Sequence, residues 1–168
     1  MPISIYDASV PALVRGLNNL SAILDKGEQF ARTRKIDPAV LINSRLAPDM
    51  FALARQVQIV SDTAKGCVSR LSGSESPSYP DEEASFGELR ARLAKTVGYV
   101  QSIDPATLQS AEDRTVTLKL PGRELQFSGR DFLFTFALPN FYFHITAAYL
   151  ILRHNGVDLG KTDYLGAA

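Results

Sequence analysis

The feature that most constrains this chain is residues 132–152, a run that contains no Lys, Arg, Asp or Glu. Its sequence, FLFTFALPNFYFHITAAYLIL, is long enough to cross a bilayer as a helix. However, Pro139 lies in its middle, Asn140 and His144 interrupt its apolar character, and no other segment resembles a partner span. We therefore interpret the run as a buried central helix, because a helix that is apolar on all sides is typical of the middle of a bundle.

Composition and charge exclude several classes of protein. A chain of 168 residues most simply forms one domain, residues 1–168, with a sizeable core. Its 18 basic and 18 acidic side chains balance, so there is no electrostatic case for nucleic acid or an anionic membrane. The single cysteine, Cys67, excludes an internal disulfide, and the N-terminus lacks the basic and apolar regions of a signal peptide. We expect a cytoplasmic protein.

Apolar residues recur at three- and four-residue spacing in four segments, which predicts helices near 4–26, 48–71, 85–103 and 129–155. Ser4 and Ser85 begin capping patterns, Ser128 can cap the last helix, and Pro48 suits the first turn of the second. Gly27 is expected to end the first helix, and a short helical turn is expected at 37–42 in the connector that follows.

Two further segments have other signatures. SGSESPSYPDEEA, residues 72–84, is rich in Pro and Ser and is predicted to be a loop. TVTLKL alternates with period two and is followed by PGRE and LQF, which predicts a β-hairpin at 114–128. The expected fold is all-α, an antiparallel four-helix bundle with a small β-hairpin between the third and fourth helices.

The segment FYFHITAAYLILRHNGV resembles the last helix of the DinB/YfiT-like superfamily, whose pattern places an arginine nine residues after a histidine, as Arg153 follows His144. LAPDMFALARQVQIVSD, together with the segment from Leu138 to Gly166, is more closely similar to an uncharacterised bacterial branch, a domain of unknown function. The resemblance implies an antiparallel four-helix bundle that often forms a homodimer. It also implies relatives with a three-histidine metal site, some of which transfer small thiols.

The chain departs from that metal site. The superfamily pattern has an H-x-x-x-H pair on the last helix, but here the positions four before and four after His144 are Asn140 and Ala148, and the second helix has no histidine. His154 would lie about 15 Å further along the helix axis. An ion would need Asp49, Gln56 or the amide of Asn140, and carboxamides are poor zinc ligands. We expect a degenerate site without a metal cofactor.

The role of His144 has two interpretations. It is either an ordinary core histidine bonded to a backbone carbonyl or a carboxylate, or an acid–base or ligand-orienting residue in a pocket between helices. Asp49 and Gln56 are seven residues apart, so on one helix they would share a face, and we expect them to be the polar groups that meet His144. Asp49 could equally serve only to favour a helix N-terminus. We take His144, Asn140, Gln56 and Asp49 as the candidate ligand-binding residues.

Two functional classes remain open. The first is a small-molecule-binding or regulatory domain that keeps the fold and has lost the metal. The second is a transferase or hydrolase that depends on a metal or on His144, with no catalytic residue assignable beyond it. Cys67 is predicted to be buried and unreactive rather than a thiol activated by Lys65. The tail, residues 156–166, either closes over the bundle as a lid or packs Tyr164 and Leu165 against its surface.

Overall fold

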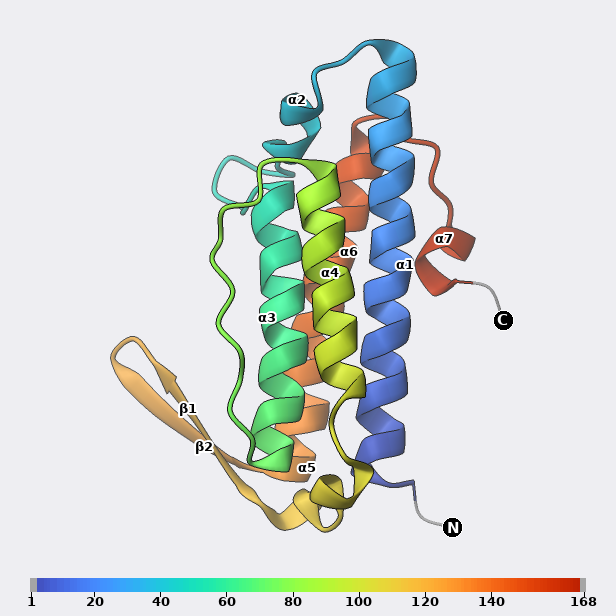
Figure 1. Ribbon diagram of the computed structural model, residues 1–168. Helices are drawn as coiled ribbons and strands as arrows, with labels where there is room; N and C mark the ends of the chain where they lie inside the picture. The colour runs from blue at the N-terminus through green and yellow to red at the C-terminus, as the bar shows by residue number, and fades with distance from the viewer. Residues whose placement is uncertain (1–2, 167–168) are drawn as a thin grey trace.

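The computed structural model describes residues 3–166 and contains a four-helix bundle with a β-hairpin at one end (Figure 1). This confirms the predicted fold class. The long helices are α1 (Ile5–Arg34), α3 (Leu53–Ser72), α4 (Phe86–Gln101) and α6 (Leu138–His154). The shorter elements are α2 (Pro38–Ile42), η1 (Pro105–Leu108), η2 (Ala111–Asp113), β1 (Thr115–Leu120), β2 (Arg123–Ser128), α5 (Gly129–Asp131), η3 (Phe132–Ala137) and α7 (Lys161–Leu165).

The bundle consists of two antiparallel pairs, α1 with α4 and α3 with α6, which also pack against each other (Figure 1). Helices α3 and α4 run in the same direction, because residues 73–85 return the chain along the whole length of α3. We call residues 73–85 the crossover loop. A helix of 20 residues is about 30 Å long, which the extended residues of this loop can span. The loop therefore lies on the outside of α3 and α4.

Helix α1 continues past the predicted end at Gly27 and stops at Lys35, which has a left-handed φ of 55° and whose N–H bonds the carbonyls of Ala31 and Arg32. The predicted end was wrong because Gly27 has a packing role. A Cβ atom there would lie 3.1 Å from side-chain atoms of Leu152 and Phe86. Glycine thus allows α1 to approach its neighbours closely instead of ending the helix.

Helix α3 begins at Leu53, not near residue 48 as predicted. Pro48 lies in the connector between α2 and α3, and the Leu53 N–H bonds the carbonyl of Ser44 at 2.9 Å. The connector therefore turns back on itself before the helix starts. As a consequence, Asp49 is an exposed connector residue and does not share a helix face with Gln56.

The last helix is continuous from Gly129 to His154 but contains a π-helical segment, Phe132–Ala137, just before Pro139. Proline has no N–H to donate within a helix, and a wider turn accommodates the missing bond. By length and composition alone this helix could cross a membrane. Here its inner face packs on α1 and α3, whereas Phe134, Phe143 and Leu150 are exposed. The expectation of burial on all sides was therefore wrong.

The remaining predictions of local structure are mostly confirmed. Strands β1 and β2 pair antiparallel from Thr115–Ser128 to Leu120–Arg123, with Gly122 at a φ of 76° in the turn. Ser85 and Glu88 form the predicted capping box of α4. In the tail, residues 156–166, α7 packs on α1. This agrees with the alternative in which the tail packs against the surface of the bundle.

Candidate functional site

The site begins where α3 and α6 cross, at the contact between Gln56 and His144. Both side chains are buried, with 1% and 7% of their surfaces exposed. The Nδ1 atom of His144 lies 2.6 Å from the Oε1 atom of Gln56. The Nε2 amide of Gln56 in turn donates to the carbonyl of Phe51 at 3.1 Å. A carboxamide therefore joins the connector, α3 and α6 at one point.

These bonds define the protonation of the imidazole. The carbonyl of Phe51 can only accept, so the NH₂ group of Gln56 faces it and the amide oxygen faces His144. That oxygen also only accepts, so Nδ1 must carry the hydrogen. Burial, and then the positive charge of Arg55, lower the pKa of His144 below its ordinary value. The ring is therefore neutral at pH 7, and its Nε2 atom is a hydrogen-bond acceptor.

Asn140 lies one turn earlier on α6 and has a different partner. Its Nδ2 amide donates to Thr63 Oγ1 at 2.9 Å. Thr63 follows Gln56 by two helical turns, so α3 and α6 are joined by two successive polar bridges along one seam. Thr63 was not among the predicted residues, although its seven-residue spacing from Gln56 placed it on the same face.

The fourth predicted residue does not join this group. Asp49 is exposed in the connector, and no hydrogen bond or ion pair of its side chain is found among residues 3–166. The structure thus brings together His144 with Gln56, and Asn140 with Thr63, but not all four predicted residues in one pocket. The late start of α3 is the physical reason.

Two surface hollows flank the two bridges. One, of about 350 Å³, is apolar, and its wall includes Phe143, whose ring stands edge-on to the His144 imidazole with centroids 5.1 Å apart. The other, of about 200 Å³, contains Asn140 and Thr63 and extends under the hairpin. Neither His144 nor Gln56 is itself in the wall of either hollow. The apolar hollow is lined by Leu46, Met50, Tyr142, Phe143, Thr146, Ala147 and Leu150.

The donor set does not fit a three-histidine metal centre. Within residues 3–166, no group of three or more His, Cys, Asp or Glu side chains is arranged to hold an ion. The α3–α6 seam offers one imidazole, two carboxamides and one hydroxyl, which is a weak set for zinc. Cys67 is buried in α3, and burial raises the pKa of its thiol to about 12. It is therefore an unreactive core residue.

Comparisons with known proteins agree with this architecture. Residues 5–165 match the family model described as "Domain of unknown function (DUF1993)". A crystal structure of a DinB family member protein from Shewanella denitrificans is similar over 98% of this chain and 93% of that chain, with 47% sequence identity and a TM-score of 0.89. The comparison with curated proteins gives no match. The chain therefore belongs to the DUF1993 family, a family of unknown function within the DinB-like superfamily.

Proposed function

We propose that this protein is a small-molecule-binding or regulatory domain that has kept the DinB-like bundle with a degenerate metal site. The observation that carries the proposal is the buried His144–Gln56 pair. The amide holds Nδ1 as the donor, so Nε2 keeps its lone pair, and Nε2 has no hydrogen-bond partner among the described residues. Because this atom keeps some accessible surface and is held in one orientation, it can accept a hydrogen bond from a ligand that supplies a donor.

The neighbouring apolar hollow supports a ligand with both a donor and an apolar part. Phe143 contacts the imidazole, lines the hollow and is 58% exposed. We propose that a rotation of this ring would connect the hollow to the imidazole. The ligand would then donate an O–H or N–H group to His144 and place its apolar part against Met50 and Leu150.

The alternative is a transferase or hydrolase in which His144 acts as a base. A neutral imidazole with a free Nε2 is the correct form for that role. However, Nδ1 is held by an amide and not by a carboxylate, so little stabilises the imidazolium that proton transfer would create. The lowered pKa points the same way. Binding is therefore the function that the geometry favours.

A screen of small metabolites against the purified protein tests this proposal. Binders that carry a donor group and an apolar part are titrated into wild-type protein, His144→Ala and the control His154→Ala, whose residue is exposed at the end of α6. We expect at least one binder to lose about tenfold or more in affinity only with His144→Ala, which corresponds to at least ~1.4 kcal/mol. If His144→Ala lowers only thermal stability and changes no affinity, the proposal is wrong.

We also infer that the protein forms a homodimer through the outer face of α6. Tyr142, Phe143 and Leu150 are large apolar residues with 39%, 58% and 42% of their surfaces exposed, and they line the hollow beside His144. A symmetric pair would bury this patch twice and cover the hollow. Leu150→Glu is expected to shift sedimentation at tens of micromolar to the 18.4 kDa monomer, whereas Leu165→Glu on α7 is not. A wild-type protein that is monomeric at that concentration contradicts this inference.

A further inference from the structure

The crossover loop is held against α3 and α4 by a buried arginine. Only 2% of the Arg92 side chain is exposed, and its guanidinium donates to Glu83 at 2.9 Å, to the carbonyl of Pro80 at 2.9 Å and to Asp62 at 2.8 Å. Asp81 lies 3.1 Å away. The Nε of Arg92 is also buried and has no hydrogen-bond partner among residues 3–166.

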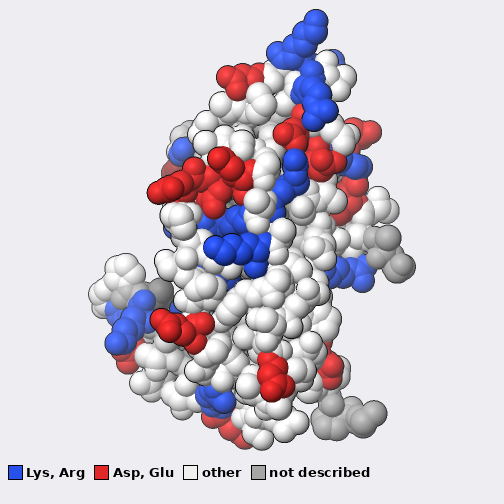
Figure 2. All heavy atoms as spheres, viewed as in Figure 1, with Lys and Arg blue, Asp and Glu red and all other residues white. Residues whose placement is uncertain are grey.

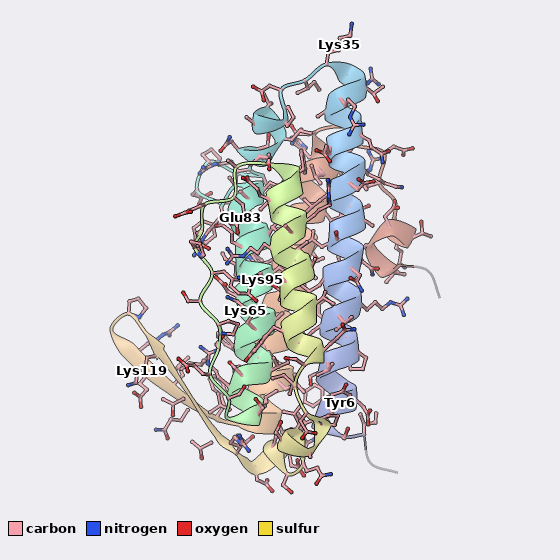
Figure 3. All side chains as sticks on the ribbon, viewed as in Figure 1. Tyr6, Lys35, Lys65, Glu83, Lys95 and Lys119 are labelled. Atoms are coloured by element: carbon pink, nitrogen blue, oxygen red, sulfur yellow. The ribbon has the colours of Figure 1, made fainter. Side chains whose placement is uncertain are left out.

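Tyr79, also in the crossover loop, lies between two lysines. The Lys65 Nζ is 3.7 Å and the Lys95 Nζ 4.1 Å from the centre of its ring. Lys65 is neutralised by Asp62 at 3.0 Å and donates to the carbonyl of Pro77. Lys95 is exposed, and within the described part of the chain its ammonium has no carboxylate partner. Figure 3 shows Lys65, Lys95 and Glu83 on the same face of the bundle.

A hollow of about 330 Å³ opens between this loop and α4. Its wall includes Tyr79, Arg92 and Lys95 as well as Glu82, Glu83 and Glu88. Figure 2 shows the same juxtaposition, with Lys and Arg atoms in the middle of this face directly below a band of Asp and Glu atoms. The volume is within the range of small-molecule sites.

The charged groups of the wall differ in whether they are already paired. Glu83 is bonded to Arg92 and Gln58, and Glu88 caps the first turn of α4. By contrast, no partner of the Glu82 carboxylate is found in residues 3–166, and it is exposed. The hollow therefore offers one ammonium group without a carboxylate partner in the described residues, that of Lys95, together with one carboxylate without a partner, that of Glu82.

We propose that this hollow is a binding site for a small zwitterion that carries one carboxylate and one ammonium group. The carboxylate end would lie against Lys95 and the ammonium end against Glu82. A ligand with only negative charge would have to lie beside three glutamates, and one with only positive charge beside Lys95 and Arg92. A dipolar ligand avoids both repulsions. This site is separate from the His144 site and does not depend on its proposed role.

Calorimetric titration with ω-amino acids tests the proposal. The series runs from glycine to 6-aminohexanoate and so varies the distance between the two charges. Each compound is compared with its N-acetyl derivative and its methyl ester, which each remove one charge. The variants are Lys95→Met and Glu82→Gln, both exposed and expected to fold, and the matched controls are Lys119→Met and Glu124→Gln on the hairpin.

We expect one member of the series to bind, and both derivatives to bind at least tenfold more weakly. Lys95→Met and Glu82→Gln should each weaken binding at least tenfold, while the hairpin controls leave it unchanged. The proposal is overturned if no member binds at 10-millimolar concentration, on the order of the weakest specific sites. It is also overturned if binding is the same in Lys95→Met and Glu82→Gln as in the controls. His144→Ala should not affect this binding. A failure of the zwitterion proposal would therefore leave the His144 proposal intact, and a failure of the His144 proposal would leave the zwitterion proposal intact.

Discussion

Replacing Gln56 with leucine tests whether the buried pair is an energetic unit. The substitution keeps the side-chain size but removes the acceptor of the His144 Nδ1–H at 2.6 Å and the donor to Phe51 at 3.1 Å. The first loss dominates, because that bond is buried and the Phe51 bond is only partly so. An unsatisfied buried donor costs ~1–3 kcal/mol. We therefore expect the free energy of unfolding to fall by about 2 kcal/mol, measured by urea denaturation followed by circular dichroism.

The double variant distinguishes a lost bond from lost packing. With both Gln56→Leu and His144→Leu, the buried Nδ1–H is no longer present, and only the partly buried carbonyl of Phe51 lacks its former donor. The double variant should therefore be about as stable as the less stable single variant or more stable. The expected coupling energy is ~1–3 kcal/mol. As a control, Gln56→Leu and Lys119→Met on the hairpin should be additive within ~0.5 kcal/mol. A coupling energy between Gln56 and His144 that is no larger than the control would refute the argument.

Three further outcomes follow from the same contacts. Burial and the charge of Arg55 keep the pKa of His144 in the folded protein below its value in the unfolded chain, so the unfolded chain binds the proton first as the pH falls. The free energy of unfolding, measured by urea denaturation, should therefore fall as the pH decreases through about 6.5, by at most ~1.4 kcal/mol per pH unit. This pH dependence should be smaller in His144→Leu. Arg92→Met should lower the free energy of unfolding by about 1–3 kcal/mol, and so the melting temperature by roughly 3–10 °C, because it removes a buried donor from Glu83, whose side chain is 13% exposed, and from the carbonyl of Pro80. Asp62 and Asp81 are 42% exposed and keep Lys65 and Arg55 as partners. Arg90→Met, whose partner Glu28 is 30% exposed, should cost about 1 kcal/mol or less. Protein purified without an affinity tag should contain clearly less than one equivalent of zinc by elemental analysis, since the α3–α6 seam supplies one imidazole.

The fold was predictable from sequence because the signals were redundant. Apolar spacing, the Ser85–Glu88 capping box and the period-two hairpin all indicated the same elements, and the structure contains them. The element ends were less predictable, because they depend on contacts between distant residues. Gly27 continues α1 because Leu152 and Phe86 approach it, and no local pattern reveals that. Pro48 could have begun a helix, but the Leu53–Ser44 bond closes the connector instead.

The contacts of the candidate site could be predicted only for residues whose position on a helix face determines which helix they contact. His144 and Gln56 were expected to meet, and they do, since both lie on inward faces of helices that pack together. Asp49 was placed beside them by assuming that α3 begins near residue 48, and that assumption was wrong. The Arg92 network was not predicted at all. Its partners come from the crossover loop, and an irregular loop has no periodicity from which its side-chain positions could be inferred.

The polar groups along the α3–α6 seam are paired with one another. If Asn140 and Gln56 lacked these partners, a half-buried and a buried carboxamide would carry unsatisfied donors, at a cost of ~1–3 kcal/mol for a fully buried group and less for a half-buried one. Instead Thr63 accepts from Asn140, while Gln56 bridges Phe51 and His144. These bonds hold the seam together without an ion. They leave one strong acceptor, the Nε2 of a neutral imidazole. If the protein binds a small molecule as we propose, this acceptor and the apolar hollow would select it by one donor and its shape, not by its charge.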